Sequence, residues 1–249
     1  MAAGLTGFDG TTQTAREISG GLRRLVRAGR VVLVNDAVTS YLGAIGFEPG
    51  VVVAAGTGVI ALAGDTEGNF VRGNGWGYVL GDDGGGYYVG RRGLAAALRR
   101  HDGRGGSEDL LRRAEAVYGP PEAIKGRVYA ADNPPGVVAG FAPEVAEAAR
   151  AGDPEAAEIW ADAAREVALT ATACLGRVFA PDAPVTVSWT GSLFDARDLM
   201  LEPFRRHVEE SWPAARLFPP TGDAIEGAGL LCAPRASSMF APLIHVSGH

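Results

Sequence analysis

The segment 73–93 constrains the fold of this chain more than any other, because nine of its 21 residues are glycine. Glycine makes up about 7% of an average protein. It has no Cβ atom, so a dense run of it inside an ordinary sequence indicates that the backbone approaches a ligand closely. The segment therefore predicts a ligand-binding loop set between elements of regular structure.

The composition of the 249 residues excludes several classes of protein. Hydrophobic residues make up 47% and charged residues 21%, which is typical of a globular protein of one or two lobes. The uncharged stretch between Glu48 and Asp65 has only 16 residues, fewer than a spanning helix needs. The residues after Met1 include neither the positively charged region nor the continuous apolar run of a secretory signal, so the sequence predicts a cytoplasmic protein. A net charge of -6 argues against nucleic acid or membrane as a partner and favours a small molecule.

Reactive side chains are few. The basic residues are 22 arginines and a single lysine, Lys125, which lies outside any glycine-rich loop. A lysine Schiff base and a lysine-containing phosphate loop are therefore not expected, so backbone amides would have to bind a nucleotide. Cys174 and Cys232 are expected to be buried core thiols, and any metal is expected to be a hard ion held by oxygen, with no metal-binding residue identified.

Hydrophobic patterning divides the chain into alternating strands and helices. Strands are predicted at 31–34, 51–55, 59–63 and 185–188. Helices are predicted at 11–28, 39–45, 87–100, 108–118, 143–150, 154–179, 196–211 and 223–231. The tail after residue 234 shows little pattern and is expected to be poorly ordered.

Asp36 directly follows an aliphatic run that is typical of a strand buried on both faces. Such strands place functional groups at their carboxyl ends, where a carboxylate could accept the proton of a substrate hydroxyl. Equally, Asn35 and Asp36 could cap a helix that begins near Val38. The residues alone leave both interpretations open.

Two glycine-containing loops are candidates for ligand binding. Gly56, Thr57 and Gly58 lie between two predicted strands and can present successive N–H groups and one hydroxyl to a phosphate, although the same residues fit an ordinary hairpin turn. In the segment 75–85, a tryptophan at position 76 is not expected in a loop that only connects two elements. Asp82, beside a second aspartate, could accept hydrogen bonds from sugar hydroxyls or reach a metal-bound water.

Five segments together carry a resemblance to a known family. They are NDA at 35–37, VVVAAGTG at 51–58, GNGWGYVLGDDGGGYYVG at 73–90, AGFAPEVAEAARAGD at 139–153 and TGSLF at 190–194. In this order and spacing they resemble the N-acetylglucosamine kinase family, of the BadF/BadG/BcrA/BcrD-type branch of the actin, sugar-kinase and Hsp70 superfamily. The resemblance covers residues from about 4 to 233.

The resemblance implies an α/β protein with the ribonuclease H-like actin/sugar-kinase fold, in which a cleft separates two lobes. Residues 1–48 would be the remnant of a small lobe, 49–233 the large lobe and 234–249 the tail. The implied activity is ATP-dependent phosphorylation of an amino sugar, N-acetylglucosamine or glucosamine, with Mg²⁺ as cofactor. A homodimer formed through the large lobe is also implied.

The resemblance also implies roles for individual residues. Asp36 matches the catalytic aspartate that deprotonates the sugar hydroxyl. The substrate-binding loop is matched by Gly75, Trp76, Gly77 and Asp82. The second phosphate loop is matched by Gly56, Thr57 and Gly58, and positions lining the adenosine pocket are matched by Gly140, Gly191 and Ser192. Phosphoryl transfer relies on positioning and amide donors, which suits a chain without a reactive lysine.

Two departures from the family pattern affect these expectations. Relatives begin with a strand, a first phosphate loop of the DGGGT type, two more strands and a sugar-contacting asparagine, all of which would precede Met1. The small lobe is therefore expected to be truncated, and kinase activity to be weak or lost unless another polypeptide supplies the missing strands. Val59 and Ile60 also replace a Ser-Asn type pair, and Gly81-Asp82-Asp83-Gly84-Gly85 replaces GDEGS.

Two other functions are compatible with the same segments. A non-catalytic sugar- or nucleotide-binding module could keep the glycine-rich loops without catalysing a reaction. A dehydratase-activating ATPase of the same branch would need cysteine ligands for an iron–sulfur cluster, for which Cys174 and Cys232 offer little support.

Overall fold

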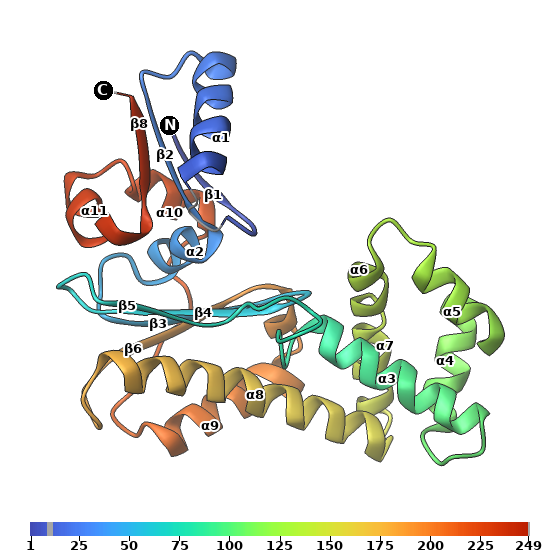
Figure 1. The fold of residues 1–249 in the computed structure, drawn as a ribbon. Helices are drawn as coiled ribbons and strands as arrows, with labels where there is room; N and C mark the ends of the chain where they lie inside the picture. Colours follow the sequence, from blue (N-terminus) through green and yellow to red (C-terminus); the bar gives the residue numbers. More distant parts are fainter. Residues whose placement is uncertain (9–11, 249) are drawn as a thin grey trace.

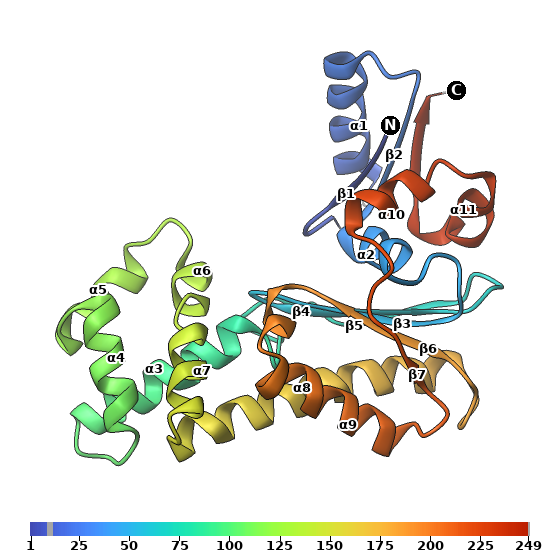
Figure 2. The same ribbon diagram turned by 180° about the vertical axis from the view of Figure 1, so that it is seen from behind.

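The computed structural model describes residues 1–8 and 12–248. Figures 1 and 2 show three parts: a small three-stranded sheet with helices around it, a five-stranded sheet below it, and a helical extension to one side. One hydrophobic core is shared by the five-stranded sheet and the extension. A second lies between that sheet, the N-terminal part and the C-terminal segment, and a third lies within the N-terminal part.

The five-stranded sheet is the centre of the molecule, with the strand order β5-β4-β3-β6-β7. Strand β3 (Gly50–Ala55) pairs in antiparallel fashion with β4 (Val59–Gly64), which pairs likewise with β5 (Phe70–Asn74). On its other side β3 runs parallel to β6 (Thr186–Thr190), and β6 to β7 (Arg216–Leu217). Helices α8 (Pro154–Val178) and α9 (Glu202–Ser211) lie on one face and α2 (Asp36–Ile45) on the other (Figure 1). Because both faces are covered, β3 and β4 consist mainly of valine and alanine.

The helical extension follows the glycine-rich segment. It contains α3 (Gly86–His101), α4 (Glu108–Tyr118), α5 (Pro121–Tyr129), α6 (Pro134–Ala139) and α7 (Ala142–Arg150). Phe141, which is fully buried, and Tyr118 pack with their ring centroids 5.9 Å apart and join α4 to the start of α7. The extension thereby holds α6 and α7 beside the end of the five-stranded sheet (Figure 2).

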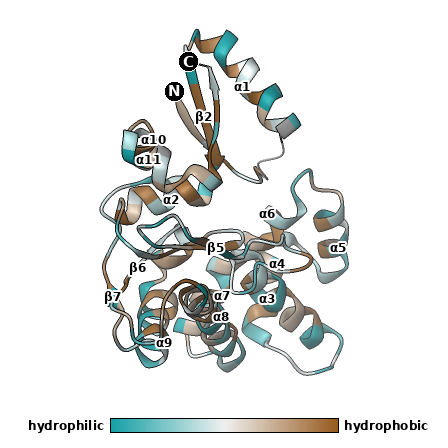
Figure 3. Cartoon of the chain, turned by 60° about the vertical axis from the view of Figure 1, so that its left-hand side comes forward, coloured by the Kyte–Doolittle hydropathy of each residue, from teal (hydrophilic) through white to brown (hydrophobic). Residues whose placement is uncertain are grey.

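The small sheet combines both ends of the chain. Strand β1 (Ala2–Leu5) runs parallel to β2 (Arg30–Asn35), and β2 pairs in antiparallel fashion with β8 (His245–Gly248). Helix α1 (Thr12–Val26) packs on one face through apolar side chains. In Figure 3, β2 is brown and α1 alternates between brown and teal, as expected for a buried strand beneath an amphipathic helix.

The C-terminal segment returns to the N-terminal part, contrary to expectation. Helix α10 (Ala224–Leu230) packs on α2 so closely that a Cβ atom at Gly43 would overlap the backbone of Asp223, and one at Gly227 would overlap that of Thr39. The tail after residue 234, expected to be poorly ordered, instead forms α11 (Pro234–Met239), a 3₁₀ turn (Ala241–Leu243) and β8. Phe240 is buried among Tyr41, Phe47 and Phe70, which explains why this segment is held. The predicted lobe boundary near residue 48 stays a prediction.

Most other predicted elements agree with the structure to within a few residues. The helix predicted at 11–28 begins at a residue outside the described ranges, and its described part ends at Val26. The helix predicted from residue 196 starts with a π-helical turn (Arg197–Leu201) before α9. Cys174 is buried as expected, but Cys232 is exposed, so that expectation was wrong. Within residues 1–8 and 12–248, no helix has the length and apolar character required to cross a bilayer.

Candidate active site

A hollow of about 640 Å³ lies where the small sheet faces the end of the five-stranded sheet. It brings together most of the residues that the sequence singled out. Asp36 lies on the side of the small sheet, and Gly56, Thr57, Gly58 and Gly191 lie on the side of the five-stranded sheet. The other lining residues are Thr6, Gly7, Phe8, Asn35, Ser40, Ala54, Ala55, Val59, Ile60, Arg72, Gly75, Gly77, Asp82 and Thr190.

Asp36 is the first residue of α2 and does not cap it. Its neighbour Asn35 is the N-cap, because the Asn35 side chain accepts a hydrogen bond from the backbone N–H of Ala37 at 3.0 Å. The Asp36 carboxylate is therefore free to line the hollow. The Thr6 hydroxyl donates to Oδ2 of Asp36 at 2.7 Å, which orients the carboxylate and leaves Oδ1 without a bond to another described side chain.

The turn at Gly56–Gly58 is held from behind by the start of α3. The N–H of Gly86 donates to the carbonyl oxygen of Gly56 at 2.7 Å, and that of Tyr87 donates to the carbonyl oxygen of Thr57 at 2.9 Å. These bonds fix the turn against the helix while the turn itself still lines the hollow. A rigid backbone turn of this kind can present N–H groups to an anion with little reorganisation.

Asp82 is held in the hollow by the loop 75–82. Asn74 closes this loop, because its Oδ1 accepts from the backbone N–H groups of Asp82 at 2.7 Å and Gly75 at 3.1 Å. The Asp82 carboxylate lies against Gly58, where a Cβ atom would be only 2.5 Å from Oδ2. Desolvation raises the pKa of Asp82 above its usual value, and the charge of Asp83 adds to the shift, while hydrogen bonds from the backbone of Val59 and Gly77 oppose it.

We expect Asp82→Asn to raise the thermal midpoint of unfolding at pH 7. The ionised carboxylate is disfavoured in the folded chain, so the folded state binds the proton more tightly than the unfolded state. The contribution of Asp82 to the stability of the wild type is therefore fully present below the pKa that this group has in the unfolded chain. It is lost as the pH rises through the higher pKa of the folded chain. The advantage of the variant should shrink as the pH falls from 7 to about 4. Thermal unfolding across this pH range measures the difference in midpoint between Asp82→Asn and the wild type, with Asp182→Asn, at an exposed aspartate, as control. A difference in midpoint that does not change with pH would contradict the expectation.

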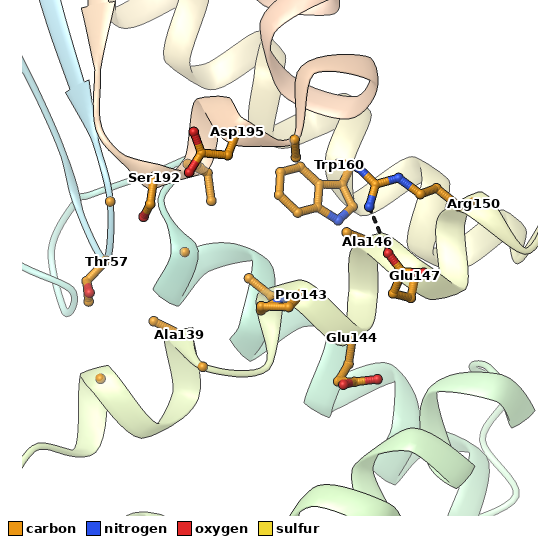
Figure 4. A pocket seen from close by; sticks show the side chains of 17 residues that line it. Thr57, Ala139, Pro143, Glu144, Ala146, Glu147, Arg150, Trp160, Ser192 and Asp195 are labelled. Carbon is orange, nitrogen blue, oxygen red and sulfur yellow. Dashed lines mark hydrogen bonds and ion pairs between the residues drawn. The ribbon is translucent and has the colours of Figure 1, made fainter.

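A second hollow of about 580 Å³ meets the first at Gly56 and Thr57. Gly140 and Ser192, both predicted to line an adenosine pocket, lie here and not in the first hollow. Gly191, predicted for the same pocket, lines the first hollow instead. Figure 4 shows Ser192 and Thr57 at one end and Trp160, Pro143 and Glu147 toward the other. The remaining lining residues are Gly86, Gly136, Ala139, Ala142, Glu144, Ala146, Arg150, Leu193, Asp195 and Ala196.

Trp76 does not join the other predicted substrate-binding residues. Its side chain is 66% exposed and lines a separate hollow beside α8, while its neighbours Gly75 and Gly77 line the first hollow. Gly75 and Gly77 both have positive φ, so the backbone turns sharply on each side of Trp76 and directs its ring outward. No direct contact between Trp76 and a ligand in the first hollow is therefore expected.

Several lining residues were missed by sequence reasoning. Thr6, which bonds Asp36, and Arg72 carry no local signal, because strand pairing and the approach of the two sheets bring them to the hollow. Trp160 lies on α8, which the sequence indicated only as a core helix. Its buried indole N–H has no hydrogen-bond partner among the described residues, although the side chain borders the second hollow. Within the described ranges, no three His, Cys, Asp or Glu side chains gather as a metal site would require.

Comparison with known proteins identifies the family. The model of the BadF/BadG/BcrA/BcrD ATPase family matches residues 4–231, and the chain belongs to this family. A curated relative, the N-acetylmuramic acid/N-acetylglucosamine kinase of Clostridium acetobutylicum, is 26% identical over 235 residues, which are 93% of this chain and 76% of the relative.

Solved structures confirm the predicted actin/sugar-kinase fold. A candidate N-acetylglucosamine kinase from Chromobacterium violaceum superposes with a TM-score of 0.74 and 32% identity, over 93% of this chain and 75% of that one. One from Porphyromonas gingivalis has a TM-score of 0.72 and 20% identity, over 92% and 77% of the two chains. A ROK family glucokinase from Streptomyces griseus, solved with glucose and AMPPNP, shares the fold with a TM-score of 0.54 and 16% identity, over 85% and 70%.

Proposed function

We propose that this protein transfers the γ-phosphoryl group of ATP to a hydroxyl of an amino sugar. The observation that carries the proposal is the junction of two hollows at Gly56 and Thr57. The first hollow contains the Asp36 carboxylate, which a substrate hydroxyl can reach, and the second hollow is large enough for a nucleoside. The named activity of the Clostridium acetobutylicum relative, which acts on N-acetylmuramic acid and N-acetylglucosamine, supports an amino sugar as acceptor.

In this proposal the sugar occupies the hollow that contains Asp36. Asp36 accepts the proton of the attacking hydroxyl, and the hydrogen bond from Thr6 holds the carboxylate in place. Asp82 accepts hydrogen bonds from other sugar hydroxyls at the opposite wall, together with the backbone of Gly75 and Gly77. The desolvation of Asp82 suits a group that exchanges water for sugar hydroxyls.

The nucleotide occupies the second hollow, with its phosphates at Gly56–Gly58. The backbone N–H groups of Thr57 and Gly58 bind phosphate oxygens, while that of Gly56 donates to the carbonyl oxygen of Gly58 within the turn. Gly140 and Ser192 line the adenosine. Mg²⁺ bound with ATP would neutralise the charge that develops on the phosphates. The oxygen atoms of Asp36 and Asp82 are of the type that Mg²⁺ prefers, so the lining of the first hollow fits this ion.

We also propose that turnover is slow. Ile60 lines the sugar hollow at a position where an asparagine is expected from the family pattern, so one polar contact to the acceptor is replaced by an apolar surface. On the side of the small sheet, Thr6, Gly7 and Phe8 line the hollow next to β1, which is an edge strand among the described residues. If turnover is undetectable while ligands still bind, the chain is a sugar- or nucleotide-binding module. A dehydratase-activating role is disfavoured, because burial raises the pKa of the Cys174 thiol to about 11 and Cys232 lies in the exposed turn between α10 and α11.

A coupled assay of ADP release tests the proposal directly. Purified protein is supplied with ATP, Mg²⁺ and a panel of hexosamines, and the phosphorylated sugar is identified by mass spectrometry. Sugar-dependent ADP release with a matching sugar phosphate is expected. ADP release without sugar dependence, or the absence of both turnover and binding of ATP and sugar by calorimetry, would contradict it. Light scattering of the same sample tests the implied homodimer.

A further inference from the structure

A further hollow, of about 520 Å³, lies between the end of β6, the start of α9 and the connection from β7 to α10. It is called the arginine hollow here, after Arg197 and Arg205 in its lining. It shares Thr190 and Gly191 with the sugar hollow and Asp195 with the second hollow. We propose that the arginine hollow binds a phosphate monoester of a compact, largely apolar alcohol or phenol, at a site outside the two hollows of the proposed reaction. The other lining residues are Trp189, Phe194, Leu201, Pro219 and Pro220.

The two arginines have no partner among the residues that the structure describes. No hydrogen bond or ion pair joins the side chain of Arg197 or Arg205 to any of these residues. Asp198, the acidic neighbour of Arg197, pairs instead with Arg150, whose Nη2 lies 2.7 Å from Oδ1 of Asp198. Asp195 is the one carboxylate in the described lining, and it is exposed and pairs with neither arginine. The described lining thus carries a net positive charge, with two guanidinium groups available to an anion.

A π-helical turn brings the two arginines to the same hollow. The turn covers Arg197–Leu201, and the N–H of Glu202 donates to the carbonyl oxygen of Arg197, five residues back. In an α-helix each residue turns by about 100°, so side chains eight positions apart would point about 80° apart. The π turn rotates each residue less, which lets Arg197 and Arg205 line one hollow with Leu201 between them. Such turns are rare and occur frequently at functional sites, which favours a binding role.

Two guanidinium groups suit a dianion better than a monoanion. A phosphate monoester carries about 1.5 to 2 negative charges near pH 7 and three terminal oxygens. Each guanidinium can bond two of these oxygens in parallel, whereas a carboxylate has one charge and two oxygens, which a single arginine satisfies. Arg205 is half-buried, so salt screens its charge less than that of a fully exposed arginine.

The rest of the lining favours an organic body on the phosphate. The volume exceeds that of an inorganic phosphate and lies within the range of small-molecule sites, about 300–1,000 Å³. The walls include the rings of Trp189 and Phe194, with centroids 6.2 Å apart, and the prolines Pro219 and Pro220. An apolar ring placed against these side chains loses contact with water, which stabilises the complex.

A ligand in this hollow would join segments that are far apart in the sequence. Pro219 and Pro220 belong to the connection 218–223, which leads from β7 to α10 (Figure 2). The hydroxyl of Thr221 donates to the carbonyl oxygen of Gly43 in α2 at 3.1 Å, so the connection is anchored to the N-terminal part. A ligand bound by the arginines and the prolines holds this connection against the start of α9, so it should raise the thermal midpoint of unfolding.

Calorimetry on the full chain tests the site with three probes at about pH 8, where a phosphate monoester is a dianion. Phenyl phosphate carries the proposed charge and an apolar ring, phenyl sulfate keeps the shape with one charge fewer, and inorganic phosphate lacks the ring. ADP is included to fill the second hollow. Phenyl phosphate is expected to bind with a Kd of about 1 mM or lower. It should bind about 5- to 50-fold more tightly than either of the other probes.

Variants assign the binding to the two arginines. Arg197→Gln and Arg205→Gln should each weaken the binding of phenyl phosphate by about 10- to 100-fold, because each removes hydrogen bonds between charged groups. Their thermal midpoints without ligand should match the wild type, since neither side chain has a described partner. Arg206→Gln, at an exposed arginine of α9 outside the lining, should keep the wild-type affinity. Asp195→Asn should tighten binding by about 2- to 5-fold, because the carboxylate repels the phosphate.

The outcomes separate this site from the proposed function. Absence of saturable binding of phenyl phosphate, or wild-type affinity in both Arg197→Gln and Arg205→Gln, would overturn the site. Equal affinities for phenyl phosphate and inorganic phosphate would overturn the assigned class of ligand. Sugar-dependent ADP release without binding of phenyl phosphate would leave the kinase assignment standing alone. Binding that depends on the two arginines in a chain without turnover would support the site and not the kinase.

Discussion

Asp36→Asn is expected to reduce sugar-dependent ADP release by about 10²- to 10⁴-fold, the usual contribution of a positioned general base. The amide has the shape of the carboxylate but cannot accept a proton from the attacking hydroxyl. The amide oxygen can still accept the hydrogen bond from Thr6, so the side chain should keep its place at the start of α2. Helix α2 keeps its N-cap, because Asn35 supplies it.

The measurement compares rates and binding in the same preparation. Calorimetry should show that Asp36→Asn still binds ATP and sugar with nearly wild-type affinity, so that the loss lies in the chemical step. Asp182→Asn is a suitable control, because this exposed aspartate lies before β6 at positive φ, a conformation that asparagine tolerates well. A rate for Asp36→Asn close to that of the control would exclude Asp36 as the base.

Gly191→Ala is expected to have the largest effect on stability among the residues of the site. Gly191 follows β6 with φ of 100°, a conformation that other L-residues rarely adopt. A Cβ atom there would also overlap the carbonyl oxygen of Ala55 at the end of β3, and neither backbone can move without disturbing the sheet. Strain and overpacking together should cost about 2–6 kcal/mol of unfolding free energy, or roughly 5–20 °C in thermal midpoint.

Gly152→Ala is the matched control for this substitution. Gly152 has a similar φ of 92°, but an added Cβ atom would meet nothing within 4 Å. It should therefore show the backbone strain alone, about 1–2 kcal/mol. Thermal unfolding of both variants, followed by circular dichroism, measures the difference. Equal shifts for the two variants would mean that the contact between Gly191 and Ala55 contributes nothing.

Much of the fold could be predicted because its strands are buried on both faces. The segments 31–34 and 51–55 show no alternation of apolar and polar residues, and both form central strands with both faces covered. Helices α3, α4, α7 and α8 agree closely with their predicted ranges, since each has a clear apolar stripe or a local boundary signal. Strands β1, β5, β7 and β8 and helices α5, α6 and α11 were not predicted. Strands β1 and β8, for example, are short and become strands only by pairing with β2.

The candidate site was predictable where its residues lie next to glycines or at strand ends. Asp36, Gly56, Thr57, Gly58 and Asp82 carry such signals, and the structure places all five in one hollow. Arg72 has no such signal, because its position depends on its register with Leu62 and on the approach of the small sheet. For Trp76 the residue type indicated function, but the direction of the side chain depends on the φ angles of the flanking glycines.

The sequence by itself therefore determined the central strands, most of the longer helices, the glycine turns and the family, because local patterning and motif spacing are properties of adjacent residues. Only the tertiary structure decided which of these residues share a hollow. The return of α10 and β8 to the N-terminal part, the meeting of Gly140 and Ser192 in the second hollow, and the contact between Thr6 and Asp36 all depend on strand pairing and packing between distant segments. Such contacts form between residues far apart in the chain, and no local pattern encodes them.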